Sequence, residues 1–165
     1  GEVDIASRAG EGTAVSLYFP ALVEKDDGAA AEAFSDVLSA GAGQRILVVE
    51  DNAQTRAALV AALTSLDYVI VEAGHGGEAL EVLAEQGDDI DLIISDAIMP
   101  VMGIGRLLEA LVAHGYTQSV IVVSGYLEPE EKAQLSQGGQ LFAWLTKPVR
   151  LQELAAVTAL ALSAR

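Results

Sequence analysis

The chain has 165 residues, 52% of them hydrophobic, which is enough for one ordinary domain with extensions. It has no cysteine, and this excludes a disulfide framework, thiolate catalysis and cysteine metal sites. A formal net charge of -15 without any basic cluster disfavours nucleic acid and anionic lipid as partners, and the apolar stretches are too short to span a membrane.

Residues 1–43 differ in composition from the rest of the chain. Alternating apolar residues around a Gly-Glu-Gly turn at 10–12 indicate a β-hairpin remnant over residues 1–20, which we expect to be disordered because a lone hairpin is marginally stable in water. Residues 21–43 are rich in Ala, Asp, Glu and Gly and predict a flexible acidic linker, with a transient helix around Ala30 to Leu38. Because the chain begins at Gly1 rather than Met, we expect it to be a piece of a longer protein.

Residues 44–165 alternate between short apolar runs and helical patterns. Strands are predicted at Arg45 to Val49, Tyr68 to Val71, Ile90 to Ser95, Ser119 to Ser124 and Leu141 to Thr146. Helices are predicted after an N-cap at Asn52, over Gly76 to Gln86, over Arg106 to His114, from Pro129 to about Gln137, and over Leu151 to Leu162. Five such units predict a doubly wound parallel sheet with right-handed crossovers, in which the almost continuously apolar first, third and fourth strands are central.

Polar residues follow four of these strands directly. They are Glu50 and Asp51, Asp96, Ser124 and Lys147. Because the carboxyl ends of parallel strands converge on one crevice, three carboxylates, a hydroxyl and an ammonium would meet there. This set of groups suits a divalent cation and a phosphoryl group, since Mg²⁺ takes one or two carboxylates together with water and phosphate oxygens.

Each of these side chains has a chemical role available and an ordinary structural one. Glu50 and Asp51 can approach a cation, or they lie in a solvated loop with an acidic first helix turn. Asp96 can attack phosphorus as a nucleophile, or it is an N-cap or turn aspartate. Ser124 can donate a hydrogen bond to a phosphoryl oxygen, with Gly125 leaving room, or it is an ordinary strand-end serine. Lys147 can pair with a carboxylate and then with a phosphoryl oxygen, although a surface lysine is the alternative.

Other catalytic motifs are missing from the sequence. His75 and His114 are the only histidines, and neither has a partner at ligand or catalytic spacing, so we interpret both as surface residues. Gly74 to Gly77 is glycine-rich but lacks dinucleotide-binding spacing, and it predicts a turn. No Ser/His/Asp set and no phosphate-binding P-loop motif is present.

In this order and spacing, the polar pieces resemble the receiver domain of two-component response regulators. The resemblance covers residues 45–165 and implies a flavodoxin-like fold with strand order 2-1-3-4-5. It is carried by Ile46 to Asn52, Asp91 to Pro100, Val122 to Gly125, and Lys147-Pro148.

The resemblance implies a role for each acidic residue. Asp96 would be the phosphoacceptor, taking a phosphoryl group from a phosphohistidine. Glu50 and Asp51 would hold Mg²⁺ together with Asp96 and the backbone carbonyl of Ile98. Such a domain catalyses its own aspartyl phosphorylation and dephosphorylation, although a chain of this length lacks a kinase core.

The resemblance also implies a switch. Ser124 would bind a phosphoryl oxygen, and Lys147 would pair with the acceptor carboxylate and then with the phosphoryl group. Trp144, three residues before Lys147, falls at the position of the family's rotameric switch aromatic, and a half-buried tryptophan that fills the sheet face is an equal alternative. Where the family usually continues Gly-Met-Asp-Gly after Met-Pro, residues 101–105 differ, which predicts a looser loop and a less well capped following helix. We also hypothesise that apolar Ile98 hinders an attacking water.

Residues 1–20 resemble the last hairpin of a histidine kinase ATPase domain. This order of segments implies the C-terminal receiver of a hybrid histidine kinase, located in the bacterial cytoplasm, with a parent protein that can be membrane-anchored. The implied partners are the kinase core of the same polypeptide or of a dimer partner, and a histidine phosphotransfer protein or another response regulator. Neither nucleic acid nor direct membrane contact is expected.

Two other functions remain open at this point. The first is a phosphorylation-independent docking module that kept the fold and lost the switch, for which the altered residues 101–105 are an argument. The second is a small phosphatase that passes through an aspartyl phosphate, although the nucleophile on strand one and the covering lid expected of such enzymes are missing.

Overall fold

The structure, a computed structural model, describes residues 2–8, 10, 12–18, 41–125, 135–136 and 139–164. The chain divides into two compact units, Gly1–Ala33 and Phe34–Arg165. Most of the predicted linker, including its transient helix, lies outside the described residues, and so does most of the helix predicted from Pro129.

The first unit contains an antiparallel hairpin. Strands β1 (Glu2–Arg8) and β2 (Gly12–Tyr18) pair in register over seven residue pairs. The hydroxyls of Ser7 and Thr13 lie 2.8 Å apart across the two strands. The described residues therefore form the β-hairpin that the alternating pattern indicated. The disorder expected for residues 1–20 stays a prediction.

The second unit is built on a five-stranded parallel sheet. Its strands are β3 (Arg45–Val49), β4 (Val69–Ala73), β5 (Leu92–Asp96), β6 (Ser119–Ser124) and β7 (Leu141–Thr146). Its helices are α2 (Ala53–Thr64), α3 (Gly76–Gln86), the 3-10 turn η1 (Gly87–Asp89), α4 (Ile104–Ala113) and α6 (Leu151–Ser163). The strand order β4-β3-β5-β6-β7 confirms the predicted order 2-1-3-4-5 and the flavodoxin-like fold.

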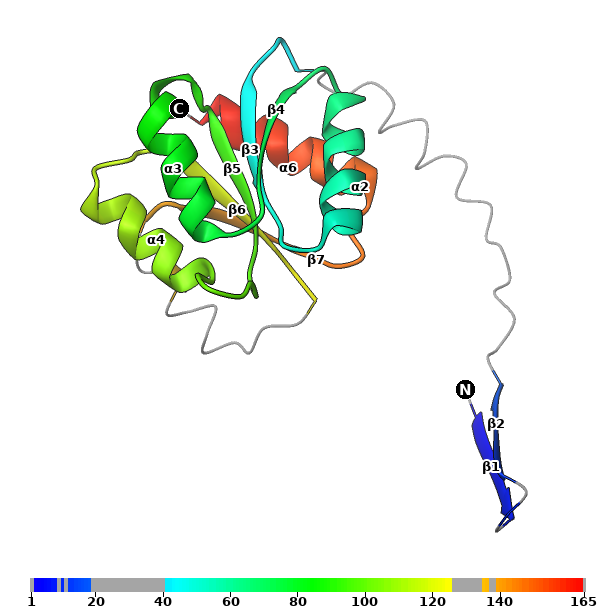
Figure 1. The fold of residues 1–165 in the computed structure, drawn as a ribbon. Helices are drawn as coiled ribbons and strands as arrows, with labels where there is room; N and C mark the ends of the chain where they lie inside the picture. Colours follow the sequence, from blue (N-terminus) through cyan, green and yellow to red (C-terminus); the bar gives the residue numbers. More distant parts are fainter. Residues whose placement is uncertain are drawn as a thin grey trace, which may run out of the picture. The chain divides into compact units, whose positions relative to one another are not determined.

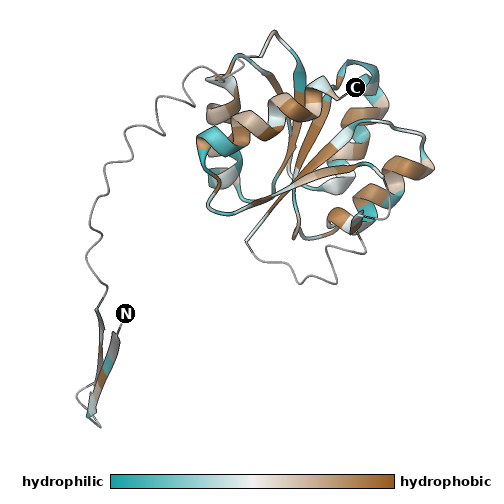
Figure 2. Ribbon diagram, turned by 180° about the vertical axis from the view of Figure 1, so that it is seen from behind, coloured by the Kyte–Doolittle hydropathy of each residue, from teal (hydrophilic) through white to brown (hydrophobic). Residues whose placement is uncertain are grey.

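The helices cover both faces of the sheet (Figure 1). Helices α3 and α4 pack on one face, and α2 and α6 pack on the other. Successive strand residues point to opposite faces, so each central strand contributes to both hydrophobic clusters: in β3, Leu47 and Val49 face α3 and α4, while Ile46 and Val48 face α2 and α6. Figure 2 shows that the central strands are hydrophobic along their length, as expected for strands that are buried on both faces.

The register of the sheet brings the carboxyl ends of its strands to one level. Val49 lies opposite Ser95, Asp96 lies opposite Val123, and Ser124 lies opposite Thr146. The residues that follow these pairs therefore emerge at one edge of the sheet. In the described part of the chain, each helix is too short or not apolar enough to cross a membrane.

Candidate functional site

Three carboxylates meet at this edge. One carboxylate oxygen from each of Glu50, Asp51 and Asp96 lies within 4.8 Å of the others. Glu50 and Asp51 follow β3, whereas Asp96 is the last residue of β5, one residue further than the predicted end of that strand. Glu50 is 1% exposed and Asp96 is 9% exposed, while Asp51 is exposed to solvent. Two carboxylates of the cluster are therefore buried, and the third is accessible to solvent.

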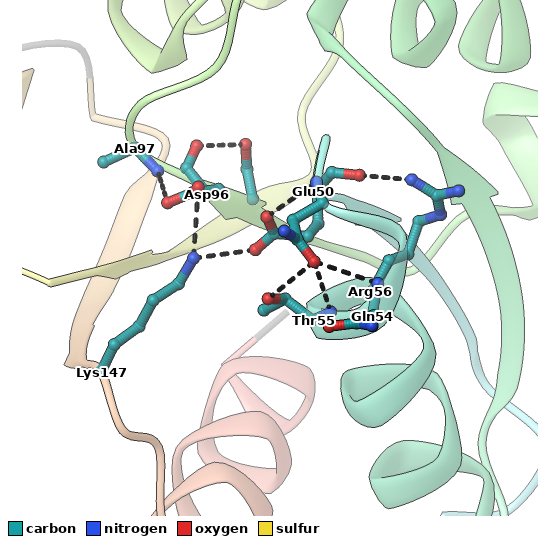
Figure 3. Close-up of polar contacts among 9 residues, drawn as sticks. Glu50, Gln54, Thr55, Arg56, Asp96, Ala97 and Lys147 are labelled. Carbon is teal, nitrogen blue, oxygen red and sulfur yellow. Dashed lines mark hydrogen bonds and ion pairs between the residues drawn. The ribbon is translucent and has the colours of Figure 1, made fainter.

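Lys147 joins two of these carboxylates. Its Nζ donates to Oε2 of Glu50 at 2.8 Å and lies 3.2 Å from Oδ2 of Asp96 (Figure 3). Burial works to lower the pKa of Lys147, but hydrogen bonds and attraction to the two carboxylates outweigh it, so the pKa is raised above its ordinary value. The ammonium therefore stays charged at neutral pH. The peptide bond from Lys147 to Pro148 is cis.

Glu50 is held at both its backbone and its side chain. Its N–H donates to the carbonyl of Ala73 at 3.1 Å, which ties the end of β3 to the end of β4. Its Oε1 accepts from the N–H of Asn52 at 3.2 Å. Asn52 is the predicted N-cap of α2, and its Oδ1 accepts from the N–H groups of Gln54 and Thr55. The helix start and the carboxylate are thus fixed by the same short turn.

Asp96 is fixed by its neighbours on β5 and β6. Its Oδ1 accepts from the N–H of Ala97 at 2.7 Å, and the same N–H lies 3.1 Å from the carbonyl of Val123. The buried hydroxyl of Ser95 donates to the Asp96 carbonyl at 2.9 Å. One carboxylate oxygen of Asp96 therefore faces the backbone, and the other faces Lys147.

Ser124 and Trp144 have the opposite strand alternation from the acidic cluster. By strand alternation, Glu50, Asp96 and Lys147 continue the set of strand residues that faces α2 and α6. Ser124 and Trp144 continue the set that faces α3 and α4. Ser124 is buried, and its carbonyl accepts from the N–H of Lys147 at 2.8 Å. Trp144 is half-buried and packs against the hydrophobic cluster beneath α3 and α4.

The loop after Asp96 presents two exposed apolar side chains. Ile98 is 70% exposed and Val101 is 79% exposed. Val101 has a φ of 69°, and the N–H of Met102 donates to the carbonyl of Pro100 at 2.8 Å, which makes a γ-turn of the rare strained kind. Gly103, the N-cap of α4, has no side-chain capping bond, which confirms the prediction of a less well capped helix.

Two contacts near the site, made by Arg56 and His75, were not predicted from the sequence. Arg56 on α2 donates from Nη1 to the carbonyl of Glu50 at 2.6 Å and from Nε to Oε2 of Glu72 at 3.1 Å. A signal did exist, because a cation in the first turns of a helix opposes the helix dipole. His75 is the N-cap of α3, and its Nδ1 accepts from the N–H of Glu78 at 3.1 Å.

The donor set fits a hard divalent cation. All three side chains of the cluster offer oxygen, the ligand type that Mg²⁺ requires. Three carboxylates and one ammonium leave an excess of negative charge on partly buried groups, and a divalent cation would relieve this repulsion. The residues present are therefore compatible with the magnesium site that the sequence predicted.

The fold and the site together define a doubly wound α/β domain with an acidic, lysine-bridged cluster at the carboxyl edge of its sheet. The sequence matches the response regulator receiver domain family over residues 46–159. The chain belongs to this family and contains a receiver domain of two-component signalling.

Similar proteins include hybrid sensor kinases. Sensor kinase CckA of Brucella abortus (strain 2308) is 35% identical over 155 residues, which cover 90% of this chain and 16% of that protein. Sensor histidine kinase RcsC of Escherichia coli (strain K12) is 36% identical over 130 residues, which cover 78% of this chain and 13% of that protein. The crystal structure of the receiver domain from the hybrid histidine kinase CckA has a TM-score of 0.60 and 32% identity, and the match covers 72% of this chain and 98% of that one. The chain thus spans less than a fifth of the length of these two curated relatives.

Proposed function

We propose that the domain is a phosphoacceptor switch in which Asp96 takes a phosphoryl group from a phosphohistidine. The observation that carries this proposal is the bridge from Lys147 to Glu50 and Asp96, because it assembles an acceptor carboxylate, a second carboxylate and a fixed positive charge at one point. Phosphoryl transfer is catalysed largely by positioning and by charge neutralisation, and both are present in this arrangement.

The transfer step can be written with this chain's own residues. A carboxylate oxygen of Asp96 attacks phosphorus, an O–P bond forms as the P–N bond breaks, and the imidazole nitrogen keeps the electron pair and takes up a proton. Lys147 moves its ammonium contact from the carboxylate to a phosphoryl oxygen, and Ser124 donates a hydrogen bond to another. Glu50, Asp51, Asp96 and the carbonyl of Ile98 would hold Mg²⁺, which when bound neutralises phosphoryl charge and orients the group.

The proposed switch uses Ser124 and Trp144. Both lie in line with the face that packs against α3 and α4, whereas the acceptor lies in line with the opposite face. A phosphoryl group at Asp96 that drew the Ser124 hydroxyl toward it would transmit the change across the sheet edge to the half-buried Trp144. This proposal makes the surface around β7 the output face.

We infer further that the chain is the receiver segment of a hybrid histidine kinase. The match to sensor kinase CckA extends over 155 residues, or 90% of this chain. Residues 44–165 alone are too few for a match of that length, so it includes part of the segment before the receiver domain. This supports residues 1–20 as the tail of a kinase ATPase domain and residues 21–43 as the linker. The phosphoryl donor would be the kinase core in the same polypeptide or its dimer partner, in the cytoplasm. A histidine phosphotransfer protein or another response regulator would be the next partner.

An amide NMR titration tests the proposal directly. We expect Mg²⁺ to shift the resonances of Glu50, Asp51 and Asp96, and beryllofluoride, a phosphoryl mimic, to extend the shifts to Ser124, Trp144 and Lys147. Asp96→Asn removes the negative oxygen that binds beryllium, so the second set of shifts should be lost in this variant. Wild-type protein in which the acidic cluster responds to neither addition would instead favour the docking module that kept the fold and lost the chemistry.

A further inference from the structure

Arg56 links the acidic site to two neighbouring elements. It lies on α2, one turn beyond the N-cap Asn52, whose carbonyl accepts from the Arg56 N–H at 2.8 Å. Its guanidinium donates to the carbonyl of Glu50 at 2.6 Å and to the Glu72 carboxylate on β4 at 3.1 Å. Figure 3 shows this guanidinium on one side of Glu50 and the Lys147 ammonium on the other.

The carbonyl that Arg56 contacts belongs to the peptide unit between Glu50 and Asp51. The orientation of that planar unit is set by ψ of Glu50 and φ of Asp51, so a contact that holds its carbonyl restrains the turn that carries both carboxylates. The N–H of Glu50, which belongs to the preceding peptide unit, donates to the carbonyl of Ala73. Arg56 holds the following unit by its carbonyl, and Glu72 holds the guanidinium in place.

The stability of the helix does not explain this arginine. The first turns of a helix favour negative side chains, and a cation there is unfavourable. The first turn of α2 has no acidic residue that would pair with it. A residue that breaks a local rule next to a functional site is commonly kept for the site.

We propose that Arg56 is a positioning residue for the acidic cluster: it fixes the Glu50–Asp51 peptide and thereby holds the carboxylates of these two residues in place for a divalent cation. This inference rests on the proposed Mg²⁺ site. It assigns Arg56 no contact with the cation or with the phosphoryl group. Its planar fork is what allows one side chain to reach both a carbonyl and a carboxylate.

The direction in which Mg²⁺ affinity changes when Arg56 is replaced distinguishes a positioning role from an effect of its charge alone. Arg56 is a cation near a cation site, so if only its charge mattered, its removal would tighten Mg²⁺ binding. If it positions the peptide, its removal weakens Mg²⁺ binding, because residues that orient metal ligands typically contribute 10- to 100-fold to affinity. The two explanations therefore predict opposite signs for the same substitution.

The experiment measures Mg²⁺ affinity by calorimetry on the full chain. Arg56→Met removes both the fork and the charge, and we expect the dissociation constant to rise about tenfold. Arg56→Lys keeps the charge but replaces the planar fork by a single ammonium, and we expect weaker binding here as well. The matched control is Arg106→Met on the exposed surface of α4, which removes the same charge and should leave the dissociation constant unchanged.

A readout without metal completes the test. In metal-free protein, Arg56→Met should shift the amide resonances of Asp51 and Asn52, while Arg106→Met should not. If wild-type protein binds no Mg²⁺, the proposed function fails, and these shifts still decide whether Arg56 positions the peptide.

Several results would overturn the inference. Tighter Mg²⁺ binding by Arg56→Met with unchanged binding by Arg56→Lys would assign the residue a charge effect alone. Unchanged affinity in both variants, or unmoved resonances of Asp51 and Asn52, would leave it no positioning role. If Arg56→Met does not fold, Arg56→Lys decides, since a dissociation constant equal to that of wild type contradicts the proposal.

Discussion

Replacement of Lys147 by methionine tests how the acidic cluster is held together in the absence of metal. The substitution keeps much of the side chain's length and apolar stem but removes the charge that bridges Glu50 at 2.8 Å and Asp96 at 3.2 Å. It leaves Glu50, which is 1% exposed, beside two other carboxylates without its counter-charge. We therefore expect the metal-free variant to be clearly less stable than wild type.

The size of the loss follows from burial. Removing one partner of a fully buried ion pair costs about 3–5 kcal/mol. The Lys147 side chain is 29% exposed, so solvent screens part of the interaction, and we expect a loss of about 2–3 kcal/mol. For a domain of this size, that corresponds to a fall in Tm of about 10 °C.

The assay is urea and thermal unfolding of metal-free protein at neutral pH, followed by the fluorescence of Trp144, the only tryptophan of the chain. Arg106→Met is the control with the same change of charge. Mg²⁺ should restore more stability to Lys147→Met than to wild type, because a divalent cation replaces the missing charge. A loss below about 0.5 kcal/mol, the range of ordinary surface substitutions, would refute the reasoning.

The same variant gives a pH test. Because the pKa of Lys147 is raised in the folded protein, its stabilising contribution is complete below the ordinary lysine pKa of 10.5 and is lost as the pH rises through the folded value. The difference in unfolding free energy between wild type and Lys147→Met should therefore be constant around neutral pH and shrink only above about pH 10.5. A difference that already disappears below pH 9 would contradict this assignment of the charge.

Two further predictions concern the loop after Asp96. Val101→Gly should stabilise the domain by about 1 kcal/mol in urea unfolding. It relieves about 1–3 kcal/mol of strain at the positive φ, and the greater freedom of the unfolded chain costs about 0.4–1 kcal/mol. A less stable variant would argue against a strained turn. Ile98→Asn should shorten the lifetime of the phosphoryl group on Asp96 with little change in stability, since Ile98 is largely exposed, whereas faster hydrolysis in wild type would contradict the hypothesis that it hinders water.

Most of the fold could be predicted from the pattern of apolar residues. The runs at Arg45–Val49, Ser119–Ser124 and Leu141–Thr146 became strands with the predicted bounds. The first two are buried on both faces, and an apolar, β-branched segment of that kind has few alternatives to a central strand. The boundaries of other elements moved by a few residues: β4 begins and ends later than predicted, and β5 extends to Asp96. Pairing with a neighbouring strand decides such ends, and a single segment does not contain that information.

The site was predictable as a set of residues but not as a geometry. The sequence named Glu50, Asp51, Asp96 and Lys147 because each follows an apolar strand, and parallel strands end at one edge. It could not show that the Lys147 ammonium lies between two carboxylates, because that contact joins residues 97 positions apart. The roles proposed for Ser124, Trp144 and Ile98 stay predictions.

The order of strands and helices along the chain, and the chemical groups available at the carboxyl edge of the sheet, could be predicted from the sequence alone. Local periodicity and strand-end positions depend on neighbouring residues. By contrast, the packing of separate elements brings the Arg56 guanidinium to the carbonyl of Glu50 and places Trp144 against the cluster beneath α3 and α4. These features depend on register and side-chain reach between separate elements. Such relations are fixed only when the whole sheet and both helical layers pack together.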